Sequence, residues 1–387
     1  MEDFNYLKSG EVYLDGACQS LRPIPVIETL ERYYTKHNSC GERVKYEWGK
    51  ETDKLVEATR EKVLKFLKLS PRKYTTSFTL NTTYGINLVL NQIDHTKFKK
   101  IMTSEIEHNS PFLATMAFSK RTGLPRELMK RNDDGSINVA DYDFTKAIVV
   151  VNCAANFDGR KLVNIKELTK AIHKAGGILI IDAAQAMAHS SDILKGVEVD
   201  AICFSAHKMY APSLGVLVWR DDLDKVLLPY WLGGGMVDDV EENKYALSAE
   251  GKEHRYTRFE SGLQAWGEII AFGKAIDWLE KVPKKTWKTL EDNSKELFDF
   301  LNSSPKVHLI NKVPNPTMSF YVEGLDSHLL GEALSRENIM ARTGYFCVHY
   351  YLDHVLHMPP LIRFSLGLHN RPEDIEKIKK VLGKVIN

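Results

Sequence analysis

Lys208 follows a buried, strand-like run, and this placement is the first indication of chemistry in the sequence. The run AICFSAH leads into Lys208, and a second apolar run, GVLVW, begins shortly after it. Burying an ammonium costs free energy unless the charge is paired or the amine is neutral. Asp182 ends another apolar run, ILIID, so its carboxylate could face the same pocket. Two interpretations remain open: a buried ion pair, or a neutral lysine that forms a Schiff base with an aldehyde cofactor.

Polar side chains also follow several other strand-like runs. They are Asn81, Thr82 and Thr83; Glu107, His108 and Asn109; Asn156; Gln185; and Ser205 with His207. In open α/β sheets, functional groups gather at the carboxyl ends of the strands. Packing alone requires only apolar strands and turn residues there, so these clusters predict one shared site. The threonine pair sits between a strand and a helix, where it suits a phosphate group or acts as a plain helix N-cap.

The composition is that of an ordinary globular chain. The sequence has 387 residues, 43% hydrophobic and 27% charged, with a formal net charge of +1. The near-neutral charge gives no case for nucleic-acid or membrane-surface binding. The most apolar run, GILIIDAAQAMA, is too short to span a bilayer, and the acidic N-terminus does not read as a signal peptide. The Rossmann glycine fingerprint and the P-loop are both absent.

Cysteine usage indicates a reducing compartment, the cytoplasm. The cysteines are scattered and include no C-x-x-C pair: Cys18, Cys40, Cys153, Cys203 and Cys347. This pattern argues against a disulfide framework and against a thiolate metal site. His349, His354 and His357 lie close together, but no further ligands accompany them, so no metal site is predicted.

The elements that must position the polar clusters alternate along the chain. From Thr75 to Arg220, short β-branched runs alternate with helical runs, which predicts an α/β layer with a mostly parallel sheet. After Gly233–Gly235, a polar stretch could hold a hairpin. The C-terminal part mixes strands and helices and predicts a smaller α+β domain. The expected boundaries are 21–270 for the large domain, and 1–20 with 271–387 for the small domain.

The ordered set of motifs resembles the pyridoxal-phosphate site of class V aminotransferase-like enzymes, above all the group II cysteine desulfurases and the selenocysteine lyases. The resemblance covers nearly the whole chain. It includes VYLDGACQS near the N-terminus, FTLNTTYGINLV at the phosphate turn, EIEHN, DAAQA followed by FSAHKMYAPSLGV, RFESG, RTGYFC and IRFSLGLHN. It implies a pyridoxal-phosphate transferase type I fold, pyridoxal 5'-phosphate as the cofactor, and a cytoplasmic homodimer.

The resemblance also implies a role for each polar residue. Lys208 would bind the cofactor covalently and later move the substrate Cα proton, and Asp182 would pair with the pyridine nitrogen. His108 would stack on the ring, and Gln185 would contact its phenolic oxygen. The remaining groups would hold the phosphate (Thr82, Thr83, Ser205 and His207), the cofactor or substrate (Asn156) and the substrate carboxylate (Arg363).

Cys347 follows RTGYF in a predicted loop, at a short spacing from Arg363 that is similar to the compact loop of group II enzymes. The resemblance implies that this thiol takes sulfur from L-cysteine, becomes a persulfide and passes the sulfur to an acceptor protein, leaving L-alanine. The hypothesis is therefore a cysteine desulfurase, a sulfurtransferase. The alternatives are a selenocysteine lyase, a class V aminotransferase or epimerase in which Cys347 is incidental, and an inactive scaffold, against which Lys208 and Asp182 argue.

The sequence departs from the family pattern at three places. Family members usually have Gly-Thr where this chain has Gly262-Leu263, and leucine cannot donate a hydrogen bond to a partner subunit's cofactor phosphate. Tyr345 and Phe346 stand where the family usually has histidines before the cysteine. The stretch CGERVKYEWG replaces a His-Arg-Gly run. These departures leave the expected cofactor site intact, whereas they weaken the case for L-cysteine as the substrate.

Overall fold

A seven-stranded sheet forms the centre of the large domain in the computed structural model, which describes residues 2–41, 44–248 and 255–386. Its strands are β2 (Tyr74–Thr79), β3 (Lys100–Ser104), β4 (Arg126–Met129), β5 (Ala147–Asn152), β6 (Ile178–Asp182), β7 (Ala201–Ser205) and β8 (Gly215–Arg220). The spatial order is β2-β8-β7-β6-β5-β3-β4. Every neighbouring pair from β4 to β7 is parallel, and only β8 runs against its neighbours. The predicted mostly parallel sheet is confirmed.

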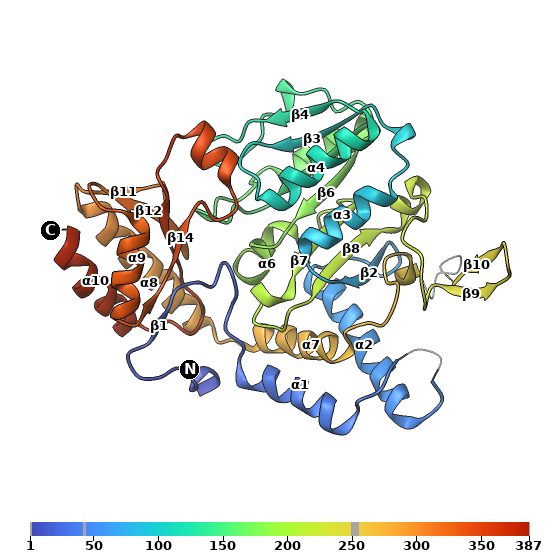
Figure 1. Ribbon diagram of the computed structural model, residues 1–387, viewed down its shortest axis with the longest axis horizontal. Helices are drawn as coiled ribbons and strands as arrows, with labels where there is room; N and C mark the ends of the chain where they lie inside the picture. Colours follow the sequence, from blue (N-terminus) through green and yellow to red (C-terminus); the bar gives the residue numbers. More distant parts are fainter. Residues whose placement is uncertain (1, 42–43, 249–254, 387) are drawn as a thin grey trace.

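Helices cover both faces of this sheet (Figure 1). Alternate residues of a strand point to opposite faces, so Ile148 and Val150 of β5 pack on one side, whereas Val149 and Val151 pack on the other. The first face is covered by α3 (Thr82–Gln92) and α4 (Asn109–Thr122). Helices of the opposite face include α2 (Glu47–Phe66), α5 (Ile165–Lys174), α6 (Ala186–His189) and α7 (Trp266–Lys281). Because both faces are covered, β5, β6 and β7 are buried along their whole length.

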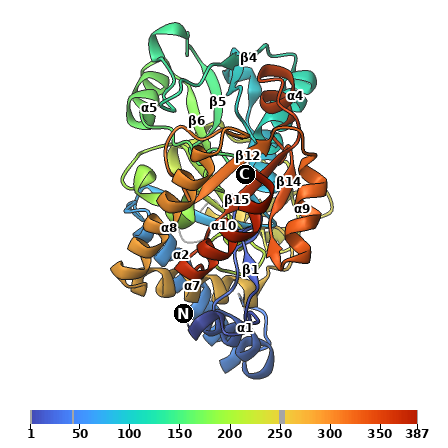
Figure 2. The ribbon, with the colours of Figure 1, turned by 90° about the vertical axis from the view of Figure 1, so that its left-hand side faces the viewer.

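The small domain is built on an antiparallel sheet. Its strands are β11 (Val307–Leu309), β12 (Thr317–Val322), β14 (Arg342–Gly344) and β15 (Leu361–Ser365), in the order β11-β12-β15-β14. The view onto this domain shows α8 (Lys284–Ser303), α9 (Ser327–Arg336) and α10 (Pro372–Ile386) around the sheet (Figure 2). Arg363 lies on β15 of this sheet, and Cys347 lies in the turn that follows β14.

The N-terminal segment joins the two domains. Its strand β1 (Val12–Tyr13) pairs in parallel with β13 (Ile339–Met340) of the small domain. The following helix, α1 (Ile24–Lys36), packs on α7 beside α2 in the large domain. The predicted division at 21–270 stays a prediction, since α7 itself crosses residue 270.

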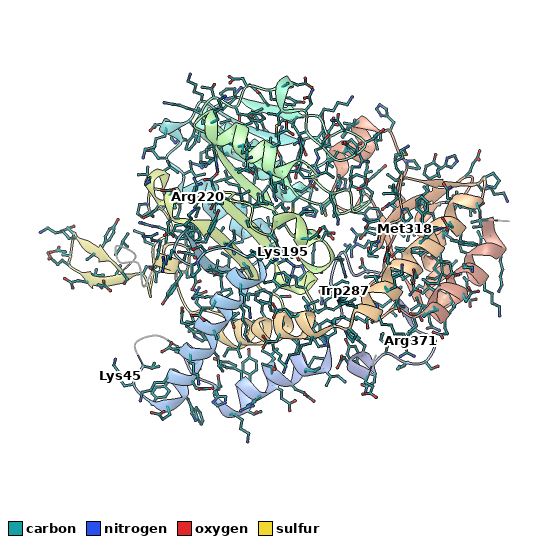
Figure 3. The ribbon with its side chains drawn as sticks, turned by 180° about the vertical axis from the view of Figure 1, so that it is seen from behind. Lys45, Lys195, Arg220, Trp287, Met318 and Arg371 are labelled. Carbon is teal, nitrogen blue, oxygen red and sulfur yellow. The ribbon has the colours of Figure 1, made fainter. Side chains whose placement is uncertain are left out.

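The expected hairpin is present as β9 (Val237–Val240) and β10 (Tyr245–Leu247), which pair antiparallel. From behind, the hairpin projects from the side of the large domain opposite Met318 and the small-domain sheet (Figure 3). The rest of the polar stretch, residues 249–254, lies outside the described residues, as do residues 42–43 of CGERVKYEWG.

Short turns complete the described chain. The 3-10 turns are Glu2–Phe4, His95–Lys97, Val139–Asp141, Ser191–Leu194, Ala206–Lys208, Asp221–Val226 and Arg255–Arg258, and a π-helical turn spans Tyr350–Val355. No helix among the described residues combines the length and the apolar character needed to cross a membrane.

A buried ion pair anchors the segment that contains RFESG. Arg60 of α2 donates two hydrogen bonds to Glu260, from Nη1 at 2.5 Å and from Nη2 at 2.7 Å. Glu260 also accepts from the amide of Phe78 in β2. Removing one member of such a pair leaves a buried charge uncompensated. The pair therefore fixes the chain around Gly262 and Leu263 against the sheet edge.

Candidate active site

The carboxyl ends of the large-domain strands open into a cavity of about 270 Å³. Residues after β2, β3, β5, β6 and β7 line one wall, and the turn after β14 with β15 lines another. The structure brings every predicted site residue to this cavity: Thr82, Thr83, His108, Asn156, Asp182, Gln185, Ser205, His207, Lys208, Cys347 and Arg363. The rule that polar residues gather at strand ends is therefore followed by this chain.

Lys208 and Asp182 lie at the ends of adjacent strands or just beyond them, and each influences the charge of the other. Asp182 ends β6, and Lys208 ends the 3-10 turn that follows β7. Burial lowers the pKa of Lys208, while the charge of Asp182 acts to raise it. Burial raises the pKa of Asp182. A hydrogen bond from the Ala184 amide at 2.9 Å and the charge of Lys208 reduce this increase but do not cancel it. A lysine with a lowered pKa has an amine that can act as a nucleophile or a base.

His108 presents a neutral ring to the cavity. It caps the N-terminus of α4, where its Nδ1 accepts a hydrogen bond from the Ser110 amide at 3.0 Å. Burial, with added repulsion from Lys208 and Arg363, lowers the pKa of His108 to about 3. The ring is therefore uncharged near neutral pH, and its orientation is fixed by the bond at Nδ1. A flat neutral ring held in this way is suited to stacking on an aromatic cofactor.

Hydroxyl groups converge at the start of α3. Asn81 caps this helix, and the Thr82 amide donates to Ser205 Oγ at 2.9 Å. The Thr82 and Ser205 hydroxyls are 2.6 Å apart. Burial lowers the pKa of the adjacent His207 to about 4, so its ring is neutral near pH 7. The N-terminus of a helix together with hydroxyl groups forms a site that can hold a phosphate.

The chain around Cys347 adopts a left-handed turn. Phe346 has φ 50° and Cys347 has φ 61°, a conformation that costs a non-glycine residue about 1–2 kcal/mol. Two contacts from the large domain hold the turn: the Asn109 amide donates to the Cys347 carbonyl at 2.6 Å, and Asn156 Nδ2 donates to the Phe346 carbonyl at 2.7 Å. The thiol-bearing residue is exposed at the cavity mouth.

The cavity retains polar atoms without partners among the described residues. Asn152 Oδ1, Asn156 Oδ1 and Arg363 Nε are buried and make no hydrogen bond. Buried polar groups are normally satisfied, so these atoms indicate a site made for a polar ligand. Together with Lys208 and the hydroxyl groups, they fit pyridoxal phosphate and an amino-acid substrate. The described residues contain no group of three His, Cys, Asp or Glu that could hold a metal ion.

Several residues of the site could not be assigned from the sequence. Gln185 Nε2 is bonded to the Ala17 carbonyl at 2.7 Å, which places the N-terminal segment in the cavity wall. Asp15 of that segment contacts Arg363, and Arg342 also lines the cavity. The motif VYLDGACQS indicated that the N-terminal segment belongs to the site. No local sequence pattern, however, shows that Ala17 contacts Gln185 or that Asp15 contacts Arg363, because the partners are far apart in the chain.

Glu107 forms a buried network beneath the cavity. Its carboxylate accepts hydrogen bonds from Ser104 Oγ and from the amide and Nδ2 of Asn152, the latter two at 2.7 and 2.9 Å. Burial raises the pKa of Glu107 to about 7, with the charge of Arg131 opposing the increase. Asn152 is paired in register with Asp182 on the adjacent strand. The network therefore orients an amide that lines the cavity.

Comparisons with known proteins agree with this geometry. The sequence profile of the family described as aminotransferase class-V matches residues 12–378. A probable cysteine desulfurase from Pyrococcus abyssi is 28% identical, over 97% of this chain and 94% of the relative. The apo structure of a cysteine desulfurase from Thermococcus onnurineus NA1 matches with a TM-score of 0.86 and 26% identity, over 97% of this chain and 94% of that one.

A further solved structure supports the fold. The cysteine desulfurase CsdA from Escherichia coli matches with a TM-score of 0.88 and 21% identity, over 99% of this chain and 96% of that one. The expected type I pyridoxal-phosphate fold is confirmed by these structural matches.

We expect Glu107→Gln to change how stability depends on pH. The folded protein holds the Glu107 proton up to a pKa of about 7, whereas the unfolded chain releases it near pH 4.5. The stability that this group supports is therefore present below pH 4.5 and lost as the pH rises to 7, by at most about 3 kcal/mol. Glu107→Gln should remove this loss. Urea unfolding at pH 5 and pH 8 measures it.

Glu127→Gln is the matched control, because Glu127 is half-exposed on β4 and pairs with Lys100 at the surface. Its stability should follow the wild-type pH dependence. If the free energy of unfolding depended on pH in the same way in wild type and in Glu107→Gln, the raised pKa of Glu107 would be contradicted.

Proposed function

Since the chain belongs to the aminotransferase class-V family, we propose that it is a pyridoxal-phosphate-dependent cysteine desulfurase that converts L-cysteine to L-alanine. One observation carries the proposal. The lysine with a lowered pKa, the strand-end aspartate and an exposed cysteine line the same cavity. An aminotransferase or epimerase needs the first two groups but has no use for the cysteine.

The described side chains supply each contact that the cofactor needs. Lys208 would bind it covalently, Asp182 would pair with the ring nitrogen and His108 would stack on the ring. Gln185 and Asn156 would contact its edge, and polar groups at the start of α3 and after β7 would hold the phosphate: Thr82, Thr83, Ser205 and His207. When bound, pyridoxal phosphate supplies an electron-withdrawing ring that stabilises negative charge at the substrate Cα.

Protein side chains bind the substrate and move its protons. Arg363 binds the substrate carboxylate, because its buried Nε is free to donate a hydrogen bond. Lys208 Nζ takes the proton from the substrate Cα, a task for which its lowered pKa is suited. The neutral His108 and the walls of the cavity keep the reacting centre partly shielded from water.

Cys347 takes the sulfur. Its thiolate attacks the substrate sulfur, a new S–S bond forms on Cys347, and the substrate C–S bond breaks with its electron pair left on carbon. Protonation of that carbon gives the methyl group of L-alanine. One L-cysteine and the Cys347 thiol thus become one L-alanine and one Cys347 persulfide, and no external oxidant or reductant is consumed.

The exposure of Cys347 supports transfer of the sulfur to an acceptor protein, since the persulfide would sit at the surface. A reducing compartment, the cytoplasm, suits an enzyme that works through a free thiol. All five cysteines are unpaired in the structure.

An apolar face beside the phosphate turn supports a homodimer. Exposed apolar side chains surround the start of α3 and α4: Leu80, Leu113, Met116, Tyr230, Trp231 and Leu263. The Trp231 ring packs against Tyr84 of α3, and the Gly262 amide bonds to the Gly234 carbonyl, which places Leu263 beside this face. Exposed apolar patches of this kind mark protein interfaces. Leu263 has no hydroxyl, so the phosphate depends on donors of its own chain.

The covalent link to Lys208 is directly testable. Borohydride reduction of the holoenzyme should bleach its colour and fix the cofactor on the peptide that contains Lys208, as read by mass spectrometry. Lys208→Ala should form no adduct, because no other amine is held at this position. Lys195→Ala, which removes a half-buried lysine of the same domain that does not line the cavity, should behave as wild type. An adduct on any other lysine would refute the assignment.

The role of Cys347 separates the desulfurase from the other class V reactions. Wild type treated with L-cysteine should gain the mass of one sulfur atom on the Cys347 peptide. Cys347→Ser should bind the cofactor and L-cysteine but release at least about 100-fold less sulfide, because the sulfur has no acceptor. Cys40→Ser, at another exposed cysteine, is the control. Full activity in Cys347→Ser would disprove this role.

The alternative functions, a selenocysteine lyase and a class V aminotransferase or epimerase, are tested by offering selenocysteine and other amino acids to the wild-type protein. A wild type that ignores cysteine and transaminates or epimerises another amino acid would replace the desulfurase by that class V enzyme. Turnover of selenocysteine alone would replace it by a selenocysteine lyase.

The dimer can be tested by sedimentation. Wild type should sediment as a dimer, whereas Leu113→Arg combined with Leu263→Arg should yield monomers, since charges would be buried in an apolar interface. Leu329→Arg, at an equally exposed leucine of the small domain, should remain dimeric. A monomeric wild type would contradict the proposal.

A further inference from the structure

Two arginines stand side by side at the cavity. Arg342 of β14 and Arg363 of β15 are directly paired in the antiparallel register, and both line the cavity. Like charges placed opposite each other on adjacent strands are destabilising. A negative group is therefore needed near this pair.

Asp15 supplies that group. Arg363 Nη2 lies 3.2 Å from Asp15 Oδ1, and Arg342 Nη1 lies 3.6 Å from Asp15 Oδ2. The charge of Asp15 also acts to raise the pKa of Arg363, against the lowering caused by burial. Each carboxylate oxygen thus faces a different arginine.

The backbone, rather than the arginines, determines where Asp15 lies. Asp15 forms a parallel bridge with Ser365, two residues beyond Arg363 on the chain. The Ser365 amide donates to the Leu14 carbonyl at 2.7 Å, and the Gly16 amide donates to the Ser365 carbonyl at 3.3 Å. Because the residues on both sides are bonded to β15, the carboxylate remains close to Arg363 when a ligand arrives.

Arg363 has one side-chain nitrogen that makes no hydrogen bond to the described residues. Its Nη1 donates to the Asn156 carbonyl at 2.9 Å and its Nη2 to Asp15, while Nε is buried without a partner among the described residues. A ligand carboxylate that binds at Nε would therefore share one guanidinium with Asp15. Two carboxylates next to one guanidinium repel each other.

We infer that Asp15 is a built-in competitor of the ligand carboxylate: it neutralises Arg363 and Arg342 in the free enzyme and weakens carboxylate binding at that site. The identity of the ligand, L-cysteine or its product L-alanine, rests on the proposed function, whereas the competition between carboxylates does not. Weakened binding favours release of L-alanine, because the product keeps the carboxylate of the substrate. Asp15 is thus a residue that sets the affinity for carboxylates and takes no part in bond breaking.

The test is the affinity of the holoenzyme for propionate and for L-alanine, measured by calorimetric titration. Asp15→Asn preserves the side-chain shape and should lower the dissociation constant of both ligands by about tenfold, because the repulsion is removed. Glu11→Gln makes the same charge change at a half-buried position of the same segment that does not line the cavity, and should have no effect. An unchanged or higher dissociation constant in Asp15→Asn would overturn the inference.

Arg342→Gln should change the dissociation constant in the direction opposite to Asp15→Asn. With one cation removed, Asp15 neutralises Arg363 more completely, so the dissociation constant should rise. The double variant Asp15→Asn/Arg342→Gln should lie between the two single variants. This variant also relieves the repulsion between the arginines, so it keeps the test valid if Asp15→Asn alone fails to fold. A double variant that binds no more tightly than Arg342→Gln would refute the competition.

Cysteine turnover distinguishes failure of this inference from failure of the proposed function. If Asp15→Asn binds propionate more tightly while wild type ignores L-cysteine, the competition stands and the desulfurase assignment falls. If wild type converts L-cysteine but propionate affinity is the same in both proteins, the assignment stands and the competition is wrong.

Discussion

Burial of charge at the carboxyl edge of the central sheet is the constraint on which the rest of the structure depends. Asp182, Glu107 and Lys208 all lie where burial disfavours the charged form of the group. Each is offset by a specific neighbour: an amide for Asp182, Arg131 for Glu107, and Asp182 for Lys208. Helices on both faces keep water away from the strands, and the polar groups of the cavity meet at the ends of the strands. The same desolvation that is costly for folding lowers the pKa of the Lys208 amine.

The second domain completes the site through backbone contacts. The Asn109 amide and Asn156 Nδ2 hold the turn that carries Cys347, and the Ser20 amide donates to the carbonyl of His207 at 3.0 Å. Each of these contacts joins residues that are far apart in the chain. Cys347, Arg363 and the residues at the strand ends are therefore aligned by hydrogen bonds between segments, because no single element contains them all.

The sequence predicted the central sheet and the residues that line the cavity, because both follow short-range patterns. Apolar runs of five or six residues identified β5, β6 and β7, and polar residues immediately after them identified the site. The reversed direction of β8 could not be predicted, since an apolar run carries no information on strand direction. The pairing of Asp15 with Arg363 and the left-handed turn at Phe346 also required the structure. They depend on contacts between distant segments: the type of Asp15 favours an arginine partner but does not indicate which arginine, and the type of Phe346 does not favour a positive φ.

The left-handed turn limits how the length of this loop can vary among related sequences. The carbonyls of two successive residues, Phe346 and Cys347, are anchored to separate points of the large domain, and the π-helical turn begins at Tyr350. Inserting a residue before the cysteine would shift both carbonyls away from their donors at once. A lengthened loop would therefore lose the fixed position of the Cys347 thiol at the mouth of the cavity.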